Sequence, residues 1–144
     1  MMEFNKYAGI GKSGEKIRVT IASGPVITEK GKVLVDKHGD DKFWKFPGGR
    51  QLDNNNFLEN TKREVKEELG IEVTLKEEPC VMAFEREKNN IKEYVILIHY
   101  LAKRKGEIKI GRDIREFKWL DIKNLPEDCA PNIKPVLEYF KNKI

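Results

Sequence analysis

The chain has 144 residues, of which 39% are hydrophobic, and this content suffices for one compact domain, which we expect to span residues 1–144. Charged residues make up 36% of the chain, the mean hydropathy is -0.62, and no apolar run approaches the roughly 20 residues of a membrane-spanning helix. The first residues lack the pattern of a secretory signal or a transit peptide. We therefore expect a cytoplasmic protein without a membrane anchor.

The charge balance and the cysteines restrict the possible partners only slightly. The 28 basic and 24 acidic residues give a net charge of +4, which suits an anionic small molecule and does not by itself require a nucleic acid. Cys80 and Cys129 are far apart and have no second sulfur or histidine close by in sequence, so neither indicates a zinc site. We expect two free, buried thiols.

The first third of the chain has the pattern of β-strands. Residues 17–28 and 32–37 are rich in β-branched residues and flank "EKGK", in which Gly31 can adopt the positive φ of a tight turn, so a hairpin is predicted. The segment "FWKFPGG" is interpreted as a further strand that ends at Pro47, with Trp44 and Phe46 in the core.

The second half adds more strands and a final helix. Residues 71–87 and 92–103 form two strand-rich segments joined by "KNN", and residues 117–122 form another strand. The basic stretch 102–112 is interpreted as a loop rim and a short strand. Residues 131–144 carry Ile133, Val136, Leu137 and Phe140 at helical spacing. The order of strands, helix, strands and helix predicts a mixed sheet covered by helices.

Between these halves lies a helix that is dense in carboxylates. Asn56 and Glu59 form a capping-box pattern that starts the helix near Phe57, and Gly70 is placed to end it in the left-handed conformation. At about 100° per residue, three glutamates share one face, beside a narrow apolar stripe. The glutamates are Glu64, Glu67 and Glu68, and the stripe is Leu58, Val65 and Leu69.

Three like charges within one and a half turns repel one another, so a compensating positive charge is expected. Mg²⁺ is a natural candidate because it takes oxygen ligands and shares its coordination shell with substrate phosphates. The Gly48–Gly49 turn offers backbone that can approach a metal or a phosphate, and the fork of Arg63 can hold a carboxylate in one orientation. Taken singly, a glycine pair is also an ordinary turn, and an acidic helix face is also an ordinary solvated surface.

Together, these features resemble a known family signature. "GGRQLDNNNFLENTKREVKEELGI" resembles the box of the Nudix hydrolases: a glycine, five residues, a glutamate, seven residues, then Arg-Glu-aliphatic-any-Glu-Glu-any-Gly-aliphatic. The matching positions are Gly49, Arg63, Glu64, Val65, Glu67, Glu68, Gly70 and Ile71. "WKFPGG" before the box and "EFKWLDIKNLPED" after it extend a weaker similarity over most of the chain. The resemblance implies an α/β (α+β) fold, a Nudix-type α/β/α sandwich with a central mixed sheet.

One position of the box departs from the pattern. Asn55 stands where the family has its first glutamate, and the acidic residue that often follows the glycine pair is replaced by Leu52. In the family, that first glutamate usually supports the loop and is not central to the metal site. We therefore expect weakened support, which Asp53 could partly supply, and not a dead enzyme.

The resemblance implies an Mg²⁺-dependent hydrolase, in which Mn²⁺ can substitute, that cleaves a nucleoside diphosphate linked to another group by attack of water on phosphorus. Its metal ligands would be Glu64, Glu67, Glu68 and the Gly48 carbonyl, with Arg63 holding Glu64. Glu64 is the first candidate for the general base, and Asp113 or Glu116 the second. Arg50, Asp113 and Glu116 are also candidates for substrate binding, and Arg50 is as readily a simple exposed side chain.

Substrate and partners are less determined. The markers typical of subfamilies that prefer ADP-ribose or dinucleoside polyphosphates are absent beyond the box. The small size of the chain, with little room for an additional domain, favours nucleoside triphosphates or similar nucleotides. The alternatives are a nucleotide-binding module without catalysis, suggested by Asn55, and an RNA 5′-end pyrophosphohydrolase that uses the basic stretch 102–112. A nucleic-acid partner is the less expected case, and a monomer or a homodimer is expected. His38, interpreted as a loop residue, and His99, interpreted as a strand residue bonded to a neighbour, are not predicted ligands.

Overall fold

The computed structural model describes residues 7–10, 14–51, 56–111 and 113–144. It contains a seven-stranded sheet, two α-helices and a short 3-10 helix. The strands are β1 (Tyr7–Ile10), β2 (Lys16–Glu29), β3 (Lys32–His38), β4 (Gly49–Arg50), β5 (Glu72–Lys88), β6 (Ile91–Lys105) and β7 (Ile114–Asp121). The helices are α1 (Phe57–Leu69), α2 (Ile133–Tyr139) and the 3-10 turn η1 (Lys141–Lys143). The predicted mixed sheet covered by helices is confirmed.

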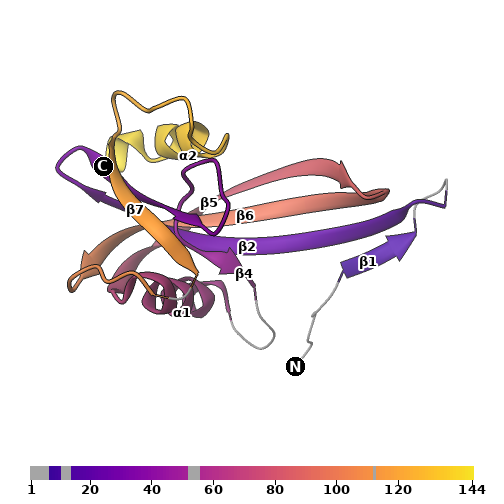
Figure 1. Ribbon diagram of the computed structural model, residues 1–144, viewed down its shortest axis with the longest axis horizontal. Coiled ribbons are helices and arrows are strands. Elements are labelled where there is room, and N and C mark those ends of the chain that lie inside the picture. The colour runs from indigo at the N-terminus through magenta and orange to yellow at the C-terminus, as the bar shows by residue number, and fades with distance from the viewer. Residues whose placement is uncertain (1–6, 11–13, 52–55, 112) are drawn as a thin grey trace.

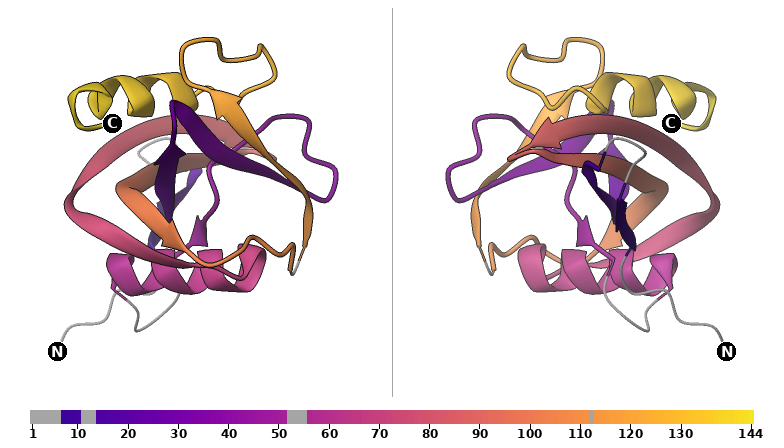
Figure 2. Two further views of the ribbon diagram at one scale, coloured as in Figure 1. Left: turned by 90° about the vertical axis from the view of Figure 1, so that its left-hand side faces the viewer. Right: turned by 90° about the vertical axis from the view of Figure 1, so that its right-hand side faces the viewer.

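The sheet is mixed and curved. Its order is β5-β6-β2-β3-β7, with β1 and β4 paired to β2. β2 and β6 run parallel over a long register, from Lys16 opposite Ile91 to Ile27 opposite Ala102, and the other pairs are antiparallel. Figure 1 and the two side views of Figure 2 show α1 on one side of the sheet and α2 on the other. The β5–β6 hairpin and the first half of β2 extend beyond the helices as an arm (Figure 1).

The core lies on both faces of the sheet, which explains why the central strands are continuously apolar. Val33 and Val35 of β3 pack in the cluster that contains α2, while Leu34 between them packs in the cluster that contains α1. β2 divides in the same way, with Val26 on the α2 side and Ile27 on the α1 side. A strand that is buried on both faces rarely contains a charged residue, yet β3 buries the side chain of Asp36.

Several predicted elements are confirmed. The hairpin turns at Lys30 and Gly31, which have φ of 50° and 76°, and the β5–β6 hairpin turns at Asn89 and Asn90, also with positive φ. Trp44 and Phe46 are buried as predicted. Neither helix among the described residues has the length and apolar character needed to cross a membrane.

Two predictions of local structure are wrong, and two others are correct only in part. "FWKFPGG" is not a regular strand, because the backbone of Trp44 pairs with the loop at Asp128 and Ala130 instead, and strand geometry returns only at Gly49–Arg50. The basic stretch contains no strand of its own: β6 continues to Lys105, and residues 106–111 are irregular. β7 begins at Ile114, earlier than the predicted residue 117. Cys129 is a free thiol but only partly buried, whereas Cys80 is free and buried.

Candidate metal and active site

Helix α1 begins and ends at the predicted residues. Asn56 Oδ1 accepts a hydrogen bond from the Glu59 N–H at 2.7 Å, and Gly70 ends the helix at φ 69°. The predicted apolar stripe is only partly correct, since Val65 and Leu69 are buried but Leu58 is exposed. The helix is therefore oriented with a partly polar face toward the sheet.

Two polar side chains take the buried positions on that face. Asn60 is fully buried and donates from Nδ2 to Ser23 Oγ at 2.9 Å and to the Gly49 carbonyl at 3.4 Å. Thr61, also fully buried, donates its hydroxyl to the Phe57 carbonyl at 2.8 Å. Hydrogen bonding removes the cost of burying these groups, and Asn60 ties α1 to β2 and β4.

Residues 48 and 49 must both be glycine because their backbone lies too close to β2 and α1 to leave room for side chains. A Cβ on Gly48, which has φ 138°, would lie 2.3 Å from the Ser23 carbonyl oxygen, and a Cβ on Gly49 would lie 2.8 Å from Cδ of Glu64. The Gly48 N–H donates to Glu68 Oε2 at 3.3 Å. The backbone of residues 48–49 is thus held between β2 and the carboxylates of α1 because no side chain intervenes.

Arg63 organises the acids of α1. Its Nη2 donates to Glu64 Oε1 and to Asn60 Oδ1, both at 2.7 Å, and its Nη1 donates to Glu67 Oε2 at 3.0 Å. Glu64 and Glu68 are 6% and 3% exposed, whereas Glu67 is exposed at the rim. The structure thus brings together Gly48, Arg63 and the three glutamates that the sequence singled out.

Asp36 is a site residue that the sequence motifs do not mark, and the interpretation of His38 as a loop residue is wrong. His38 is the last residue of β3 and not a loop residue, and its Nε2 lies 3.4 Å from Asp36 Oδ1 and 3.8 Å from Glu68 Oε1. One ligand atom from each of these three residues lies within 4.8 Å of the others. A signal was present in "KVLVDKH", because an acid next to an apolar run that is buried on both faces needs a compensating partner.

Electrostatics in this cluster favour a bound cation. Burial, together with the nearby Asp36 carboxylate, raises the pKa of Glu68 to about 8. Burial also raises the pKa of Asp36, and the interaction with Asp36 raises the pKa of His38. Carboxyl groups whose ionised form is this costly gain most from a neighbouring positive ion.

The other predicted site residues lie at the surface. Arg50 is exposed on β4, and Asp113, with φ 61°, is exposed in the turn before β7, where its carbonyl accepts from the Gly39 N–H at 3.3 Å. Glu116 is exposed and lies 3.3 Å from Arg115 Nε. Its cross-strand neighbour is Lys37, whose ammonium lies over the Trp44 ring. Leu52, Asp53 and Asn55 fall outside the described residues.

A cavity of about 700 Å³ opens beside the glycine pair. Its walls are largely apolar, and Gly48 and Gly49 form the edge that faces α1. The lining includes Phe46, Met82, Phe84, Leu97, His99 and Asn132. This volume lies in the range of sites that hold small-molecule ligands.

His99 and Asn132 form a polar pair in the wall of this cavity. His99 is buried, with Nδ1 3.2 Å from the Gly24 carbonyl and Nε2 3.1 Å from Asn132 Nδ2. A carbonyl can only accept, so Nδ1 carries the proton and Nε2 accepts from the Asn132 amide. The bond to His99 orients the Asn132 amide, whose carbonyl oxygen and second N–H are then available to bind a ligand.

The burial of His99 predicts an acid-sensitive stability. Burial lowers the pKa of His99 from 6.5 to about 4. Between pH 6.5 and pH 4, His99 is therefore protonated in the unfolded chain and neutral in the folded chain. Stability is therefore complete above pH 6.5 and falls as the pH drops, by about 2 kcal/mol near pH 5. Urea unfolding of wild type and His99→Gln between pH 7 and 5 measures this, since other groups titrate in both proteins. A stability difference that does not change with pH would contradict it.

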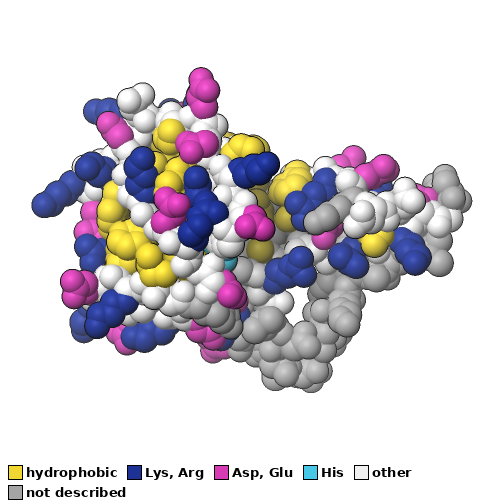
Figure 3. Space-filling view, viewed as in Figure 1, with side chains coloured by type: hydrophobic (Ala, Val, Ile, Leu, Met, Phe, Trp, Pro, Cys, Tyr) yellow, Lys and Arg dark blue, Asp and Glu magenta, His cyan; other side chains and the backbone are white. Residues whose placement is uncertain are grey.

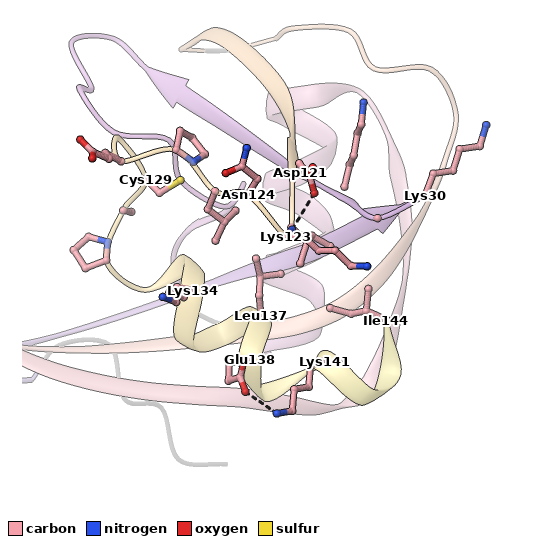
Figure 4. Close-up of a pocket in the computed structure, with 18 residues that line it drawn as sticks. Lys30, Asp121, Lys123, Asn124, Cys129, Lys134, Leu137, Glu138, Lys141 and Ile144 are labelled. Atoms are coloured by element: carbon pink, nitrogen blue, oxygen red, sulfur yellow. Dashed lines mark hydrogen bonds and ion pairs between the residues drawn. The ribbon is translucent and has the colours of Figure 1, made fainter.

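A second hollow, of about 1090 Å³, lies between the β2–β3 turn, the end of β7 and α2 (Figure 4). Several lysines line it, including Lys30 and Lys134, but none of the described residues of the box does. Lys141 is bonded to Glu138 at 2.8 Å, and Asp121 accepts from the Lys123 N–H at 2.9 Å. The face seen in Figure 3 likewise mixes basic with acidic and hydrophobic side chains, and its described part shows no continuous positive path of the kind RNA requires.

Comparison with known proteins agrees with this geometry. A family model described as the NUDIX domain matches residues 18–140. An 8-oxo-dGTP diphosphatase from Buchnera aphidicola subsp. Schizaphis graminum is 30% identical over 105 residues, which cover 69% of this chain and 75% of that protein.

Solved structures show the same fold. A MutT NUDIX hydrolase from Burkholderia pseudomallei superposes with a TM-score of 0.68 at 22% identity, covering 84% of this chain and 97% of that one. A C. elegans Ap4A hydrolase superposes with a TM-score of 0.67 at 18% identity, covering 86% and 96%. At these identities, the likeness supports the architecture of the fold alone.

Proposed function

The chain belongs to the Nudix family of pyrophosphohydrolases, and we propose that it hydrolyses a nucleoside triphosphate, with a purine base in the cavity beside the glycine pair and a divalent cation at the carboxylates of α1. The observation that carries the proposal is the position of Gly48 and Gly49. Their backbone lines a cavity of about 700 Å³ and also contacts the buried Glu64 and Glu68 of α1. A nucleotide that spans this edge has its base on one side and its phosphates on the other.

The residues fit a divalent cation. Buried carboxylates, one of them with a raised pKa, supply hard oxygen donors next to the backbone of the Gly48–Gly49 turn, which carries no side chains. Mg²⁺, or Mn²⁺ in its place, would be held by Glu64, Glu67, Glu68 and the Gly48 carbonyl. When bound, the ion polarises phosphate oxygens and lowers the pKa of the attacking water.

Side chains of the protein would position the catalytic carboxylate, accept the proton and contact the phosphates. Arg63 fixes the carboxylate of Glu64 through the bond from Nη2 to Oε1 at 2.7 Å, and this carboxylate is the first candidate to accept a proton from the attacking water. Asp113 and Glu116 are the second candidates for this base and require the turn before β7 to approach the phosphates. Arg50, exposed on β4 next to Gly49, is the candidate to contact a phosphate of the substrate.

Asn132 supports a choice among purines. Its amide offers an acceptor next to a donor, which matches a base edge that presents a donor next to an acceptor. Adenine has such an edge at N6 and N7, and so does 8-oxoguanine at N7–H and O6, whereas guanine presents two acceptors there. The relative described as an 8-oxo-dGTP diphosphatase makes 8-oxo-dGTP the first substrate to test.

The test is a panel of 8-oxo-dGTP, dGTP, dATP, a dinucleoside tetraphosphate, a nucleotide sugar and 5′-triphosphorylated RNA, assayed for phosphate and pyrophosphate release with Mg²⁺ and with Mn²⁺. We expect turnover of 8-oxo-dGTP or dATP to exceed that of dGTP. Tight binding of a nucleotide without turnover would replace this proposal by a binding module, and turnover of the RNA alone would replace it by 5′-end processing.

Asn132→Ala is expected to raise KM for the preferred nucleotide about tenfold or more, because two hydrogen bonds to the base are lost, and to change kcat little. Steady-state kinetics with 8-oxo-dGTP, dATP and dGTP measure this. Asn124→Ala is the matched control, since Asn124 is exposed and lines the other hollow. Equal losses for all three nucleotides would show that Asn132 does not select the base.

A further inference from the structure

The cluster of Asp36, His38 and Glu68 contains donors that the predicted magnesium chemistry does not use. We propose that these three side chains form a metal site with one imidazole nitrogen and carboxylate oxygens, and that it binds Mn²⁺, Co²⁺ or Zn²⁺ more tightly than Mg²⁺. The site shares Glu68 with the proposed function and so rests partly on it, but its occupancy does not depend on turnover.

The first support is the state of Asp36. Its side chain is 0% exposed, and neither Oδ1 nor Oδ2 has a hydrogen-bond partner among the described residues. The Asp36 backbone is fixed by two hydrogen bonds to Lys45, at 2.8 and 3.0 Å, but the Lys45 ammonium lies 2.9 Å from Asp41 instead. Burying a carboxylate without a full partner is destabilising, and a bound cation would compensate its charge.

The second support is geometry. Asp36 and His38 are two residues apart on β3, so their side chains lie on the same face of the strand, and His38 reaches Glu68 of α1 from that face. The His38 Nε2 atom lies 3.4 Å from Asp36 Oδ1 and 3.8 Å from Glu68 Oε1. Ligand atoms around an ion at about 2.1 Å are themselves about 3.0–3.4 Å apart. The three donors therefore need only small rotations to surround one ion.

The third support is the donor set. Mg²⁺ prefers oxygen ligands and keeps several waters, whereas imidazole nitrogen suits transition ions, whose affinities for such sites rise from Mn²⁺ toward Cu²⁺. Adding His38 to carboxylates therefore selects among divalent ions. It gives this chain a metal preference that the glutamates of α1 alone would not provide.

Calorimetric titration of the metal-free protein with Zn²⁺, Mn²⁺ and Mg²⁺ tests the preference. In His38→Gln, we expect the Kd for Zn²⁺ to rise at least tenfold and the Kd for Mg²⁺ to change less than twofold. His38 is partly exposed, so this variant should fold, which circular dichroism checks. Asp40→Asn is the matched control, because this acid lies at the surface after β3 and outside the cluster.

A second readout uses the two histidines of the chain. In imidazole ¹⁵N spectra, Zn²⁺ should shift Nε2 of His38 and leave His99 unchanged, since His99 is buried against Gly24 and Asn132. Unchanged His38 signals at saturating Zn²⁺, or equal Zn²⁺ affinity in wild type and His38→Gln, would overturn the proposal. A shifted His38 in a protein that hydrolyses no nucleotide would leave it standing and reject the proposed function instead.

Discussion

Glu68→Gln and Glu64→Gln are each expected to lower kcat at least about a hundredfold under saturating metal, with the fold preserved. Each removes a carboxylate that would hold the cation, and Glu64→Gln also removes the first candidate for the base. Both side chains are nearly inaccessible and contact residues 48–49, so the substitution changes charge with little change in shape. Steady-state kinetics with the best substrate of the panel measure the loss.

Thermal unfolding distinguishes loss of chemistry from loss of structure. Without metal, the melting temperature of Glu68→Gln should hold or rise, because the raised pKa of Glu68 shows that its charged form is costly there. Glu64→Gln should cost little, since Arg63 keeps its bonds to Glu67 and Asn60. Glu59→Gln, an exposed glutamate of the same helix, is the control and should leave both quantities unchanged. A near-normal rate in either of the two variants would show that its carboxylate does not hold the metal.

Gly48→Ala is expected to destabilise the protein by about 3 kcal/mol or more and to abolish activity in the fraction that remains folded. The new Cβ would lie 2.3 Å from the Ser23 carbonyl oxygen at a φ of 138°, so both strain and collision with rigid backbone contribute. To relieve this collision, residues 48–49 must move away from β2. That movement would also displace their backbone from the carboxylates of Glu64 and Glu68. Urea unfolding and kinetics under fully folding conditions measure the two effects.

Gly106→Ala is the control that separates backbone strain at positive φ from steric collision of the new Cβ. Gly106 also has a positive φ, 103°, but a Cβ there meets nothing within 4 Å. Conformational strain alone should cost about 1 kcal/mol and leave activity intact. Equal destabilisation by the two substitutions would show that the contact between Gly48 and β2 is not tight in solution.

Elements with strong local signals are correctly predicted from the sequence. The hairpin at Gly31, the cap at Asn56 and the left-handed end at Gly70 depend on residues within a few positions of one another. The mixed sheet with a helix on each side follows from the order of these elements. The spacing of the glutamates on α1 likewise follows from helix geometry, so their shared face is predictable without knowledge of the fold.

Predictions became wrong where distant segments compete for the same backbone or face. Trp44 pairs with the loop at residues 128–130 instead of continuing a strand, and Leu58 is exposed whereas the polar Asn60 is buried and bonded to Ser23. These choices depend on partners tens of residues away. Local propensity and periodicity carry no information about such partners, since tertiary contacts override both.

The sequence by itself determined the acids of α1, the glycine pair before them and the family, because each is written in residues that are close along the chain. Only the tertiary structure decided that Asp36 and His38 of β3 meet Glu68, and that His99 and Asn132 line one cavity with Gly48. Each of these groupings joins segments about thirty residues apart or more. Their proximity follows from the pairing of strands and from the packing of α1 on the sheet. Both depend on the burial of apolar side chains on the two faces of the sheet, and not on any local pattern.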